Sequence, residues 1–384
     1  MNNVRQLNRQ NVLEAIFSRE STSRKELCSI TGLSASTVGL IVNDLIKRGL
    51  LYESGAAESD RGRKPIVIRM DPQFVSILAV DVDELSANVY DLHGNALLQP
   101  LQMEVEGRPT PDDVVNLVKQ CLASIPQDVK LPGVIGISVP GTVDSPNGSV
   151  LSSSNLGWRN VPLGDLVTRA TGIPTIVESN MVCLTFTEAW FGESSNQNSL
   201  VYVHAGWRGV GGGIVINGEI YRGNNSSSAE IGHLQIDSEG ETCICGKRGC
   251  VETIASGRAT LLRARERLSA QGVEDANDLT WPALQEMVAA GDPIAVETMQ
   301  ETARILGQVV VTMVLLFDPA VLVLGGRVLE AHDIILPIVK KMVAEQALLM
   351  DSSDLVLGVA TDSKEKSMIG AALIAGRSYL FSLS

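Results

Sequence analysis

The sequence predicts an α/β protein with a small, mainly helical head at its N-terminus. From residue 77 onward, short apolar segments that end in glycine or acidic residues alternate with amphipathic helical segments. Residues 1–72 instead show apolar residues at helical spacing, followed by two short β-prone segments. At 384 residues the chain is long for one hydrophobic core, so we expect two or three domains.

The composition is that of a globular protein, with 45% hydrophobic and 20% charged residues. No apolar run reaches the length that spans a bilayer, and the N-terminal MNNVRQLNRQNV is not followed by an apolar stretch with a cleavage site. We therefore expect a cytoplasmic protein without a membrane partner, in a compartment where structural disulfides are rare.

Charge is unevenly distributed along the chain, whose net charge is −13. Residues 1–72 contain 11 Lys and Arg against 8 Asp and Glu, a net of +3, whereas residues 73–384 contain 20 against 36, a net of −16. A mildly basic head on an acidic body indicates that only the head meets a polyanion.

The head has the pattern of a helix-turn-helix motif after a first helix at residues 4–18. Ser23 with Glu26 is typical of a capping box that opens a short helix, and Gly32 ends that helix. Ser34 can then cap the helix ASTVGLIVNDLIKRG, which Gly49 terminates. Its buried stripe is expected to be Val38, Ile41, Val42, Leu45 and Ile46. The second helix of such a pair enters the major groove of DNA.

A wing is predicted after this helix, with strands at residues 50–52 and 66–70 around the loop ESGAAESDRGRKP. Its basic tip suits a narrow A·T minor groove, where the negative potential attracts guanidinium groups. The predicted DNA contacts are the small polar residues that open the recognition helix and the basic residues of the wing: Ser34, Ser36, Thr37, Arg61, Arg63 and Lys64. The alternative, a small helical domain with a solvated basic loop, explains the wing less well.

Three of the six cysteines fall within ETCICGKRGCVE, residues 241–252. With His233, the spacing H-x9-C-x-C-x4-C of Cys243, Cys245 and Cys250 supplies one imidazole and three thiolates, which suits a closed tetrahedral zinc site. A redox C-x-x-C pair is absent, and coincidence is the weakest explanation. The remaining cysteines, Cys28, Cys121 and Cys183, lie in apolar patterns and are expected to be buried.

The order of motifs resembles the ROK family of repressors, open reading frames and sugar kinases. The resemblance runs from the first helix through SVPGTVDSPNG, NLGWRNVPL, VGGGIVINGEIYRG, AEIGH, CICGKRGCVE and FDPAVLVLGG to SMIGAALIAG. It implies a two-lobed, actin-like fold and a zinc site at the predicted ligands. The expected domains are the winged helix-turn-helix at 1–72, a first α/β lobe at 73–190 completed by 367–384, and a second lobe at 191–366.

The resemblance also implies a set of sugar-binding residues. A closed zinc site would hold the loop that carries Glu230 and Glu252, and it would leave one nitrogen of His233 facing a ligand. In the family these positions contact the sugar, together with the Asn of an N-x-x-W loop, here Asn155, and Asn180 is a further expected contact.

The kinases of the family need three elements that this chain lacks in part. Their D-x-G-G-T-K phosphate turn corresponds to DVDELS, where Asp83 and Glu84 replace both glycines. Their catalytic Asp corresponds to Asn180, and an amide cannot act as a base near neutral pH. Their glycine-rich G-T-G loop corresponds to GWRGVGGG, in which Trp207 and Arg208 interrupt the pattern. Gly325 and Gly326 still resemble the adenosine-side turn.

These observations predict a sugar-responsive repressor of carbohydrate-utilisation genes, such as those for xylose, that is not an enzyme. It would bind an inverted repeat in double-stranded DNA as a homodimer or a dimer of dimers, with zinc as a structural cofactor and a small neutral sugar as effector. Two alternatives stay open: a sugar kinase with a regulatory head, and a DNA-bound protein whose body docks another protein.

Overall fold

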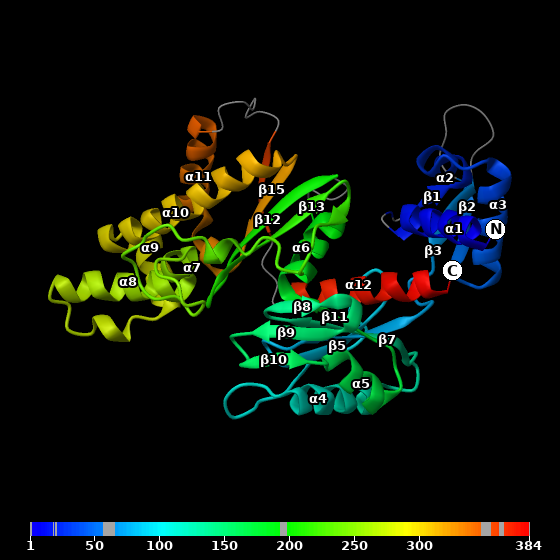
Figure 1. Ribbon diagram of the computed structural model, residues 1–384, viewed down its shortest axis with the longest axis horizontal. Coiled ribbons are helices and arrows are strands. Elements are labelled where there is room, and N and C mark those ends of the chain that lie inside the picture. Colours follow the sequence, from blue (N-terminus) through cyan, green and yellow to red (C-terminus); the bar gives the residue numbers. More distant parts are fainter. Residues whose placement is uncertain are drawn as a thin grey trace. The chain divides into compact units, whose positions relative to one another are not determined.

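The computed structural model describes residues 2–17, 19, 21–56, 66–192, 198–346, 355–360 and 365–383. The chain forms two compact units, one of residues 1–183 with 367–384 and one of residues 184–366 (Figure 1). It passes from one unit to the other within helix α6, Asn180–Phe191, and again in the first turn of helix α12, Lys366–Ser382.

The head of the first unit contains three helices and a small sheet. The helices are α1 (Asn2–Phe17), α2 (Arg24–Thr31) and α3 (Ala35–Lys47), and the strands are β1 (Thr22–Ser23), β2 (Leu51–Ala56) and β3 (Ile66–Met70), in the order β1-β3-β2. Ser23 and Ser34 cap α2 and α3 by accepting the backbone N–H of Glu26 and Thr37. Gly32 takes the left-handed conformation after α2, and the chain turns by 119° between the two helices. This angle is that of a helix-turn-helix motif.

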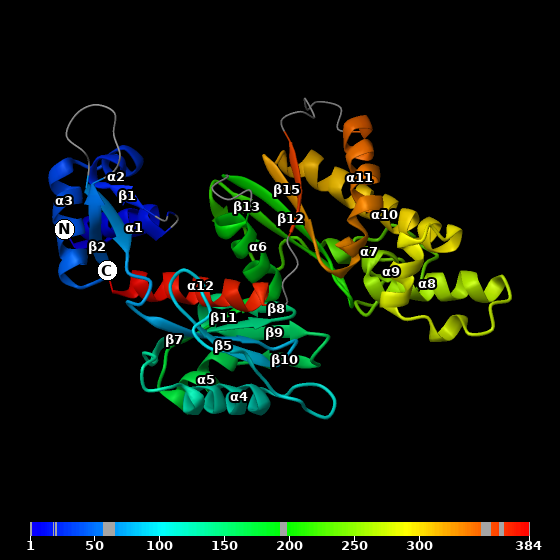
Figure 2. The ribbon, with the colours of Figure 1, turned by 180° about the vertical axis from the view of Figure 1, so that it is seen from behind.

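The first α/β lobe contains a mixed five-stranded sheet in the order β11-β7-β4-β5-β6. Its strands are β4 (Ser76–Asp81), β5 (Ser86–Tyr90), β6 (Leu101–Gln102), β7 (Pro132–Val139) and β11 (Thr175–Ser179). Helices α4 (Pro111–Ser124) and α5 (Leu163–Thr171) cover one face, and α12 covers the other (Figure 2). Gly136 lets α12 approach β7, because a Cβ there would lie 2.2 Å from the carbonyl oxygen of Ala371. A short 3₁₀ helix, η1 (Ser145–Asn147), lies within an antiparallel sheet of β8 (Thr142–Asp144), β9 (Ser149–Ser153) and β10 (Trp158–Val161).

Contacts within the first unit join α12 to the head. The Arg377 guanidinium makes two bonds to the Glu14 carboxylate of α1, at 3.0 and 2.8 Å. Arg48, at the C-terminal cap of α3, donates to the carbonyl oxygen of Leu383 at 3.1 Å. The C-terminal helix of the lobe thus contacts both the first helix of the head and the end of the recognition helix.

The second unit contains a five-stranded sheet in the order β14-β13-β12-β15-β16. Its strands are β12 (Ser199–Ala205), β13 (Val210–Ile216), β14 (Glu219–Ile220), β15 (Val321–Gly325) and β16 (Val356–Val359). Three longer helices lie between β14 and β15 in the chain: α8 (Gly257–Ala270), α9 (Trp281–Ala289) and α10 (Pro293–Phe317), with the short η3 (Ala276–Asp278) between α8 and α9. Helices α7 (Val251–Ala255) and α11 (His332–Gln346) and the 3₁₀ turns η2 (Ile231–His233) and η4 (Arg327–Ala331) complete the unit.

Helix α10 is long and apolar enough to cross a membrane by length and composition, contrary to the expectation that no segment reaches that length. Half of its apolar window is buried, and residues such as Met299, Leu306 and Val310 lie in the core of the second unit. The hydrophobic residues of α10 are therefore accounted for by packing inside an α/β lobe.

Candidate metal and ligand site

Four predicted metal ligands lie together in the second unit. One ligand atom from each of His233, Cys243, Cys245 and Cys250 falls within 4.8 Å of the other three. The Sγ atoms of Cys245 and Cys250 are 3.6 Å apart, and Cys243 Sγ lies 3.5 Å from His233 Nδ1. A tetrahedral zinc ion separates two sulfur ligands by about 3.8 Å and a sulfur from a nitrogen by about 3.6 Å. The donor set and its spacing therefore fit a tetrahedral metal ion.

The loop geometry that gathers these ligands depends on glycine. Gly246 and Gly249 both have positive φ, at 89° and 61°. A Cβ on Gly249 would lie 1.6 Å from the carbonyl oxygen of Asp237, so this position excludes every other residue. The N–H of Cys243 donates to the Lys247 carbonyl at 2.7 Å, which closes the turn that carries Cys245.

The basic residues of the loop have separate roles. Lys247 donates its backbone N–H to the Cys245 sulfur, and that bond, with the nearby ammonium charge, lowers the pKa of this thiol. Arg248 instead donates to the carbonyl oxygens of Gly240 and Glu239 at 3.0 and 3.2 Å. Lys247 thus favours the thiolate of Cys245, whereas Arg248 holds the loop backbone.

Glu230, His233 and Glu252 lie close together around this loop. Glu252 Oε1 accepts a bond from Cys243 Sγ at 2.9 Å and lies 3.5 Å from His233 Nδ1. Burial raises the pKa of Glu230, with His233 opposing and Glu252 adding to that effect, so the three groups interact electrostatically. Gly209 leaves room here, because a Cβ at that position would lie 3.1 Å from Glu252 Oε2. Two carboxylates and an imidazole therefore face a shared region at the end of η2.

The two predicted asparagine contacts belong to the first unit. Asn155 is exposed in the turn between β9 and β10, and the ring nitrogen of Trp158 anchors this turn by donating to the Pro109 carbonyl at 3.0 Å. Asn180 is the first residue of α6, directly after β11, and it is half-buried. Both thus lie in or beside a turn that follows a strand.

The turn that corresponds to the kinase phosphate loop lies between β4 and β5. Asp81 Oδ1 accepts the backbone N–H groups of Asp83 and Glu84 at 2.8 and 3.2 Å, so the turn's own carboxylate occupies the amides. Its other oxygen accepts from the Ser367 hydroxyl at the start of α12. Burial raises the pKa of Asp81 to about 6. Asp83 and Glu84 are exposed, and they present negative charge where a phosphate would need positive partners.

The glycines of GWRGVGGG serve close packing in the second unit. Gly211, Gly212 and Gly213 lie within strand β13 rather than in a loop. A Cβ on Gly213 would lie 1.7 Å from the Thr185 hydroxyl of α6, and one on Gly212 would lie 2.9 Å from Ile231. The glycine run therefore brings α6 and η2 against the sheet.

Trp207 follows the end of β12, and it contacts Arg327, which follows Gly325 and Gly326 at the end of β15. Its ring packs edge-on against Trp281 at 5.9 Å and under the Arg327 guanidinium at 5.6 Å. The Trp281 ring nitrogen donates to Glu330 Oε2 at 2.7 Å, and the backbone oxygen of Trp207 accepts from the N–H of Arg258 at 2.9 Å. An aromatic and charged cluster thus occupies the region where the sequence predicted an adenosine-side turn.

The predicted DNA contacts divide between described and undescribed residues. Ser34 Oγ bonds the hydroxyls of Ser36 and Thr37, both at 2.9 Å, and accepts the Thr37 N–H, so these hydroxyls form a linked cluster at the start of α3. Ser34 serves first as a helix cap. Arg61, Arg63 and Lys64 lie outside the described residues.

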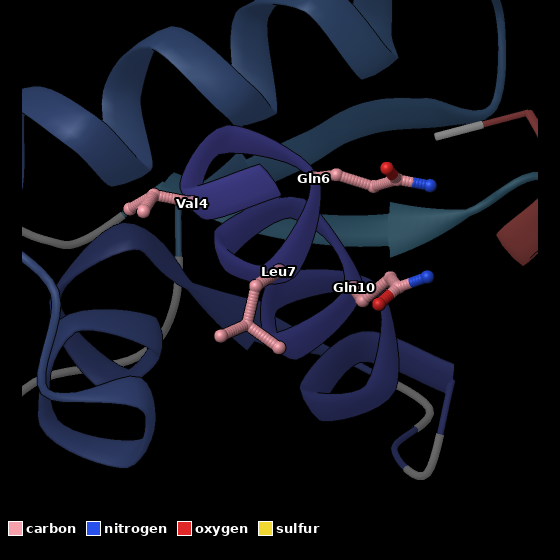
Figure 3. Close-up of a pocket in the computed structure, with 4 residues that line it drawn as sticks. All are labelled: Val4, Gln6, Leu7 and Gln10. Carbon is pink, nitrogen blue, oxygen red and sulfur yellow. The ribbon is translucent and has the colours of Figure 1, made fainter. Parts of the chain in front are cut away.

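A shallow depression on the head contains none of the predicted site residues. Figure 3 shows its lining of Val4, Gln6, Leu7 and Gln10 along α1. These uncharged side chains offer no pair of charged groups for orienting a sugar or a phosphate.

Two contacts of these regions could not be predicted from local sequence patterns. The bond from Ser367 to Asp81 joins residues that no local pattern connects. The packing of Trp207 on Trp281 joins residues 74 positions apart. Two features of the sequence could have indicated these contacts. They are Trp207 and Trp281, in a chain with only 4 tryptophans, and Ser367, which opens SMIGAALIAG.

The sequence of this chain is similar to those of known proteins. The profile described as ROK family matches residues 79–378. The xylose repressor of Caldicellulosiruptor bescii is 27% identical and is matched over 93% of this chain and 92% of its own. The DNA-binding transcriptional dual regulator NagC of Escherichia coli is 28% identical, over 98% and 94% of the two chains.

Two solved structures are similar to this chain in fold and in sequence. A ROK family transcriptional regulator, described as a homologue of the E. coli MLC protein, has a TM-score of 0.82 at 27% identity and covers 99% of this chain and 98% of its own. A ROK family glucokinase from Streptomyces griseus, in complex with glucose and AMPPNP, has a TM-score of 0.68 at 27% identity and covers 78% and 99%. Since the family profile spans most of the sequence, the chain belongs to the ROK family.

Proposed function

We propose that this chain is a sugar-responsive transcriptional repressor of carbohydrate-utilisation genes. The observation that carries the proposal is the match to repressors and a regulator over more than nine-tenths of the chain, head included. The glucokinase match covers less of the chain, 78%. The helix-turn-helix geometry of α2 and α3 supplies a physical means of binding DNA.

The head would bind an inverted repeat as part of a homodimer or a dimer of dimers, because one small module offers few base contacts. Ser34, Ser36 and Thr37 at the start of α3 are the predicted contacts in the described part of the head, and Arg61, Arg63 and Lys64 stay predicted wing contacts. The acidic body would repel DNA phosphates, which favours a complex made through the head alone.

The metal is zinc in this proposal, bound by His233, Cys243, Cys245 and Cys250. A closed set of three sulfurs and one nitrogen is a structural site, since it leaves no open position for a reacting water. Bound zinc would supply a fixed anchor for the loop between η2 and α7. His233 Nδ1 is the ring nitrogen close to Cys243, so Nε2 would be left to meet a ligand.

The effector would be a small neutral sugar bound in part by Glu230, His233 and Glu252. Carboxylate acceptors and an imidazole donor match the hydroxyls of a sugar, and two carboxylates disfavour a phosphorylated one. Asn155 and Asn180 stay predicted sugar contacts contributed by the first unit. Sugar binding would then shift the population of head geometries in the dimer, and ligand-induced release is the direction we propose.

The body has no phosphoryl-transfer activity in this proposal. Asp83 and Glu84 replace the glycines of the turn that would hold phosphate, Asn180 cannot accept the proton of an attacking hydroxyl, and Trp207 packs against Arg327, which follows the adenosine-side turn. Each of these features alone would hinder a kinase, and together they remove phosphate binding, the base and space for the nucleotide.

Fluorescence anisotropy tests this function. Labelled DNA from upstream of the chain's own gene is titrated with the zinc-loaded protein, with and without a panel of neutral mono- and disaccharides. We expect specific binding that one sugar weakens by about tenfold or more. Sugar-dependent ADP release would favour the kinase alternative. DNA binding that no sugar alters would favour a body that docks another protein.

A further inference from the structure

The outward face of the recognition helix contains an unusual apolar group. Helix α3 buries Val38, Val42 and Leu45 against the head, as an amphipathic helix should. Leu40 points away from that core and is 74% exposed, more than any other large hydrophobic side chain among the described residues. Burying a leucine is worth about 1.5–3 kcal/mol, so a solvated position usually holds a polar helix former instead.

Exposed polar side chains surround Leu40 along the outward face of α3. Ser36, one turn earlier, and Asn43, one turn later, are exposed on the same side. The neighbouring Gly39 has open space around it, since a Cβ there would meet no atom within 4 Å. Lys47 continues the same face toward the end of the helix. Gly39 thus allows another surface to approach the helix backbone closely.

Ion pairs neutralise the carboxylate of α3, so it adds no net negative charge to this face. Asp44, the acidic residue of α3, lies 2.9 Å from Arg9 and 3.0 Å from Arg48. Asn43 is held by Arg24, which donates to its side-chain oxygen at 2.8 Å and also pairs with Glu53. The exposed face of α3 therefore offers hydroxyls, an amide, a lysine and one apolar group, with its carboxylate neutralised.

Among the groups on the major-groove edges of the bases, the C5-methyl of thymine is the apolar one. Cytosine has a hydrogen at C5 in place of this methyl, so an aliphatic side chain gains less apolar contact there. From the position of Leu40 on the helix that enters the groove, we infer that Leu40 reads thymine through its methyl group and is a specificity residue of the operator complex. This inference rests on the proposed DNA-binding function.

Uracil substitution tests the contact because it removes the methyl and leaves the hydrogen-bonding edge intact. Binding sequences are first selected from a random duplex library with the wild-type protein. They are then synthesised with thymine or with uracil, and their affinities for wild type, Leu40→Ala and Leu131→Ala are compared. Leu131 is a matched control, since it is 68% exposed in the first lobe and far from α3 in the sequence.

We expect wild type and Leu131→Ala to lose about fourfold in affinity for each contacted methyl that is removed. Leu40→Ala should bind the thymine duplex more weakly than wild type and lose less on going to uracil. Its thermal stability should match that of wild type, because the side chain is exposed. A selection repeated with Leu40→Ala should give a weaker preference for thymine at the same position.

Several results would overturn the inference. Equal losses for wild type and Leu40→Ala would assign the methyl contact to another residue, and no loss for wild type would remove the contact. A Leu40→Ala protein that sediments as a smaller species with unchanged uracil sensitivity would place Leu40 in a contact between copies. If no sequence is enriched by wild type, the proposed DNA-binding function fails, and this inference fails with it.

Discussion

The thiol loop of the second unit and the β4–β5 turn of the first correspond to two functional parts of the ROK kinases, but only the loop is complete. In the loop, all four donors lie within 4.8 Å of one another, and two glutamates stand beside them. In the turn, the exposed Asp83 and Glu84 stand where the kinases have two glycines. The residues proposed to hold a sugar lie close together, whereas carboxylates replace the two glycines of the kinase turn.

This difference shows that binding and catalysis have separable physical requirements. A sugar pocket needs fixed donors and acceptors, which a metal-anchored loop provides without any reaction. Phosphoryl transfer needs in addition free backbone N–H groups, a base and room for a nucleotide. A protein can therefore lose the second set while the first continues to report the presence of a sugar. The predictions below test each side of this comparison.

The largest effect should come from breaking the thiol loop. Cys250→Ser removes a buried ligand, and structural zinc sites in small domains contribute about 10–16 kcal/mol of apparent binding free energy. We expect the purified variant to lose its zinc, measured by atomic emission, and to lose its sugar response. Cys28→Ser, which changes a thiol outside the cluster, should keep both. A Cys250→Ser protein that retains zinc and sugar response would disprove the metal assignment.

The β4–β5 turn should make the stability of the protein depend on pH. The pKa of Asp81 is raised from 3.8 to about 6, so the neutral acid stabilises the fold fully below pH 3.8, and this contribution is lost as pH rises to 6. Asp81→Asn keeps an acceptor for the turn amides without the charge. We expect it to be more stable than wild type above pH 6, by at most about 3 kcal/mol.

Urea unfolding of both proteins between pH 4 and pH 8 measures this difference. The gap in unfolding free energy should widen from pH 4 to about pH 6 and then stay constant. A constant gap over the whole range would show that Asp81 does not titrate in this window.

A smaller effect is expected from weakening the sugar contacts while the loop stays intact. Glu230→Gln removes one charge-assisted acceptor, worth about 1.5–3 kcal/mol, and should lower affinity for the effector sugar about tenfold to a hundredfold. Calorimetric titration measures it, with the exposed Glu239→Gln on the same loop as control. DNA affinity without sugar should be unchanged. An unaltered sugar affinity would remove Glu230 from the sugar contacts.

The extent to which sequence predicts these regions depends on how local each feature is. The ligand spacing around Cys243 and the caps at Ser23 and Ser34 lie within short segments, so residue type and spacing were enough. The bond from Ser367 to Asp81 spans 286 positions, and it forms only because α12 packs on the sheet. The glycines of β13 were assigned to a loop by analogy, but their packing against Thr185 depends on the position of α6.

The smallest expected effect is the absence of kinase activity in a variant that regains the catalytic carboxylate. This result would show that the base is not the only element of phosphoryl transfer that the first unit has lost. Asn180→Asp returns a carboxylate base to the start of α6, where the kinases have one. We expect no sugar-dependent ADP release above wild type in a coupled assay with ATP, magnesium and a panel of hexoses and pentoses. Asp83 and Glu84 would still repel phosphate, and Trp207 would still pack on Trp281. Phosphorylation by this single variant would mean that the base alone was missing, and that the turn and the tryptophan cluster leave the nucleotide site usable.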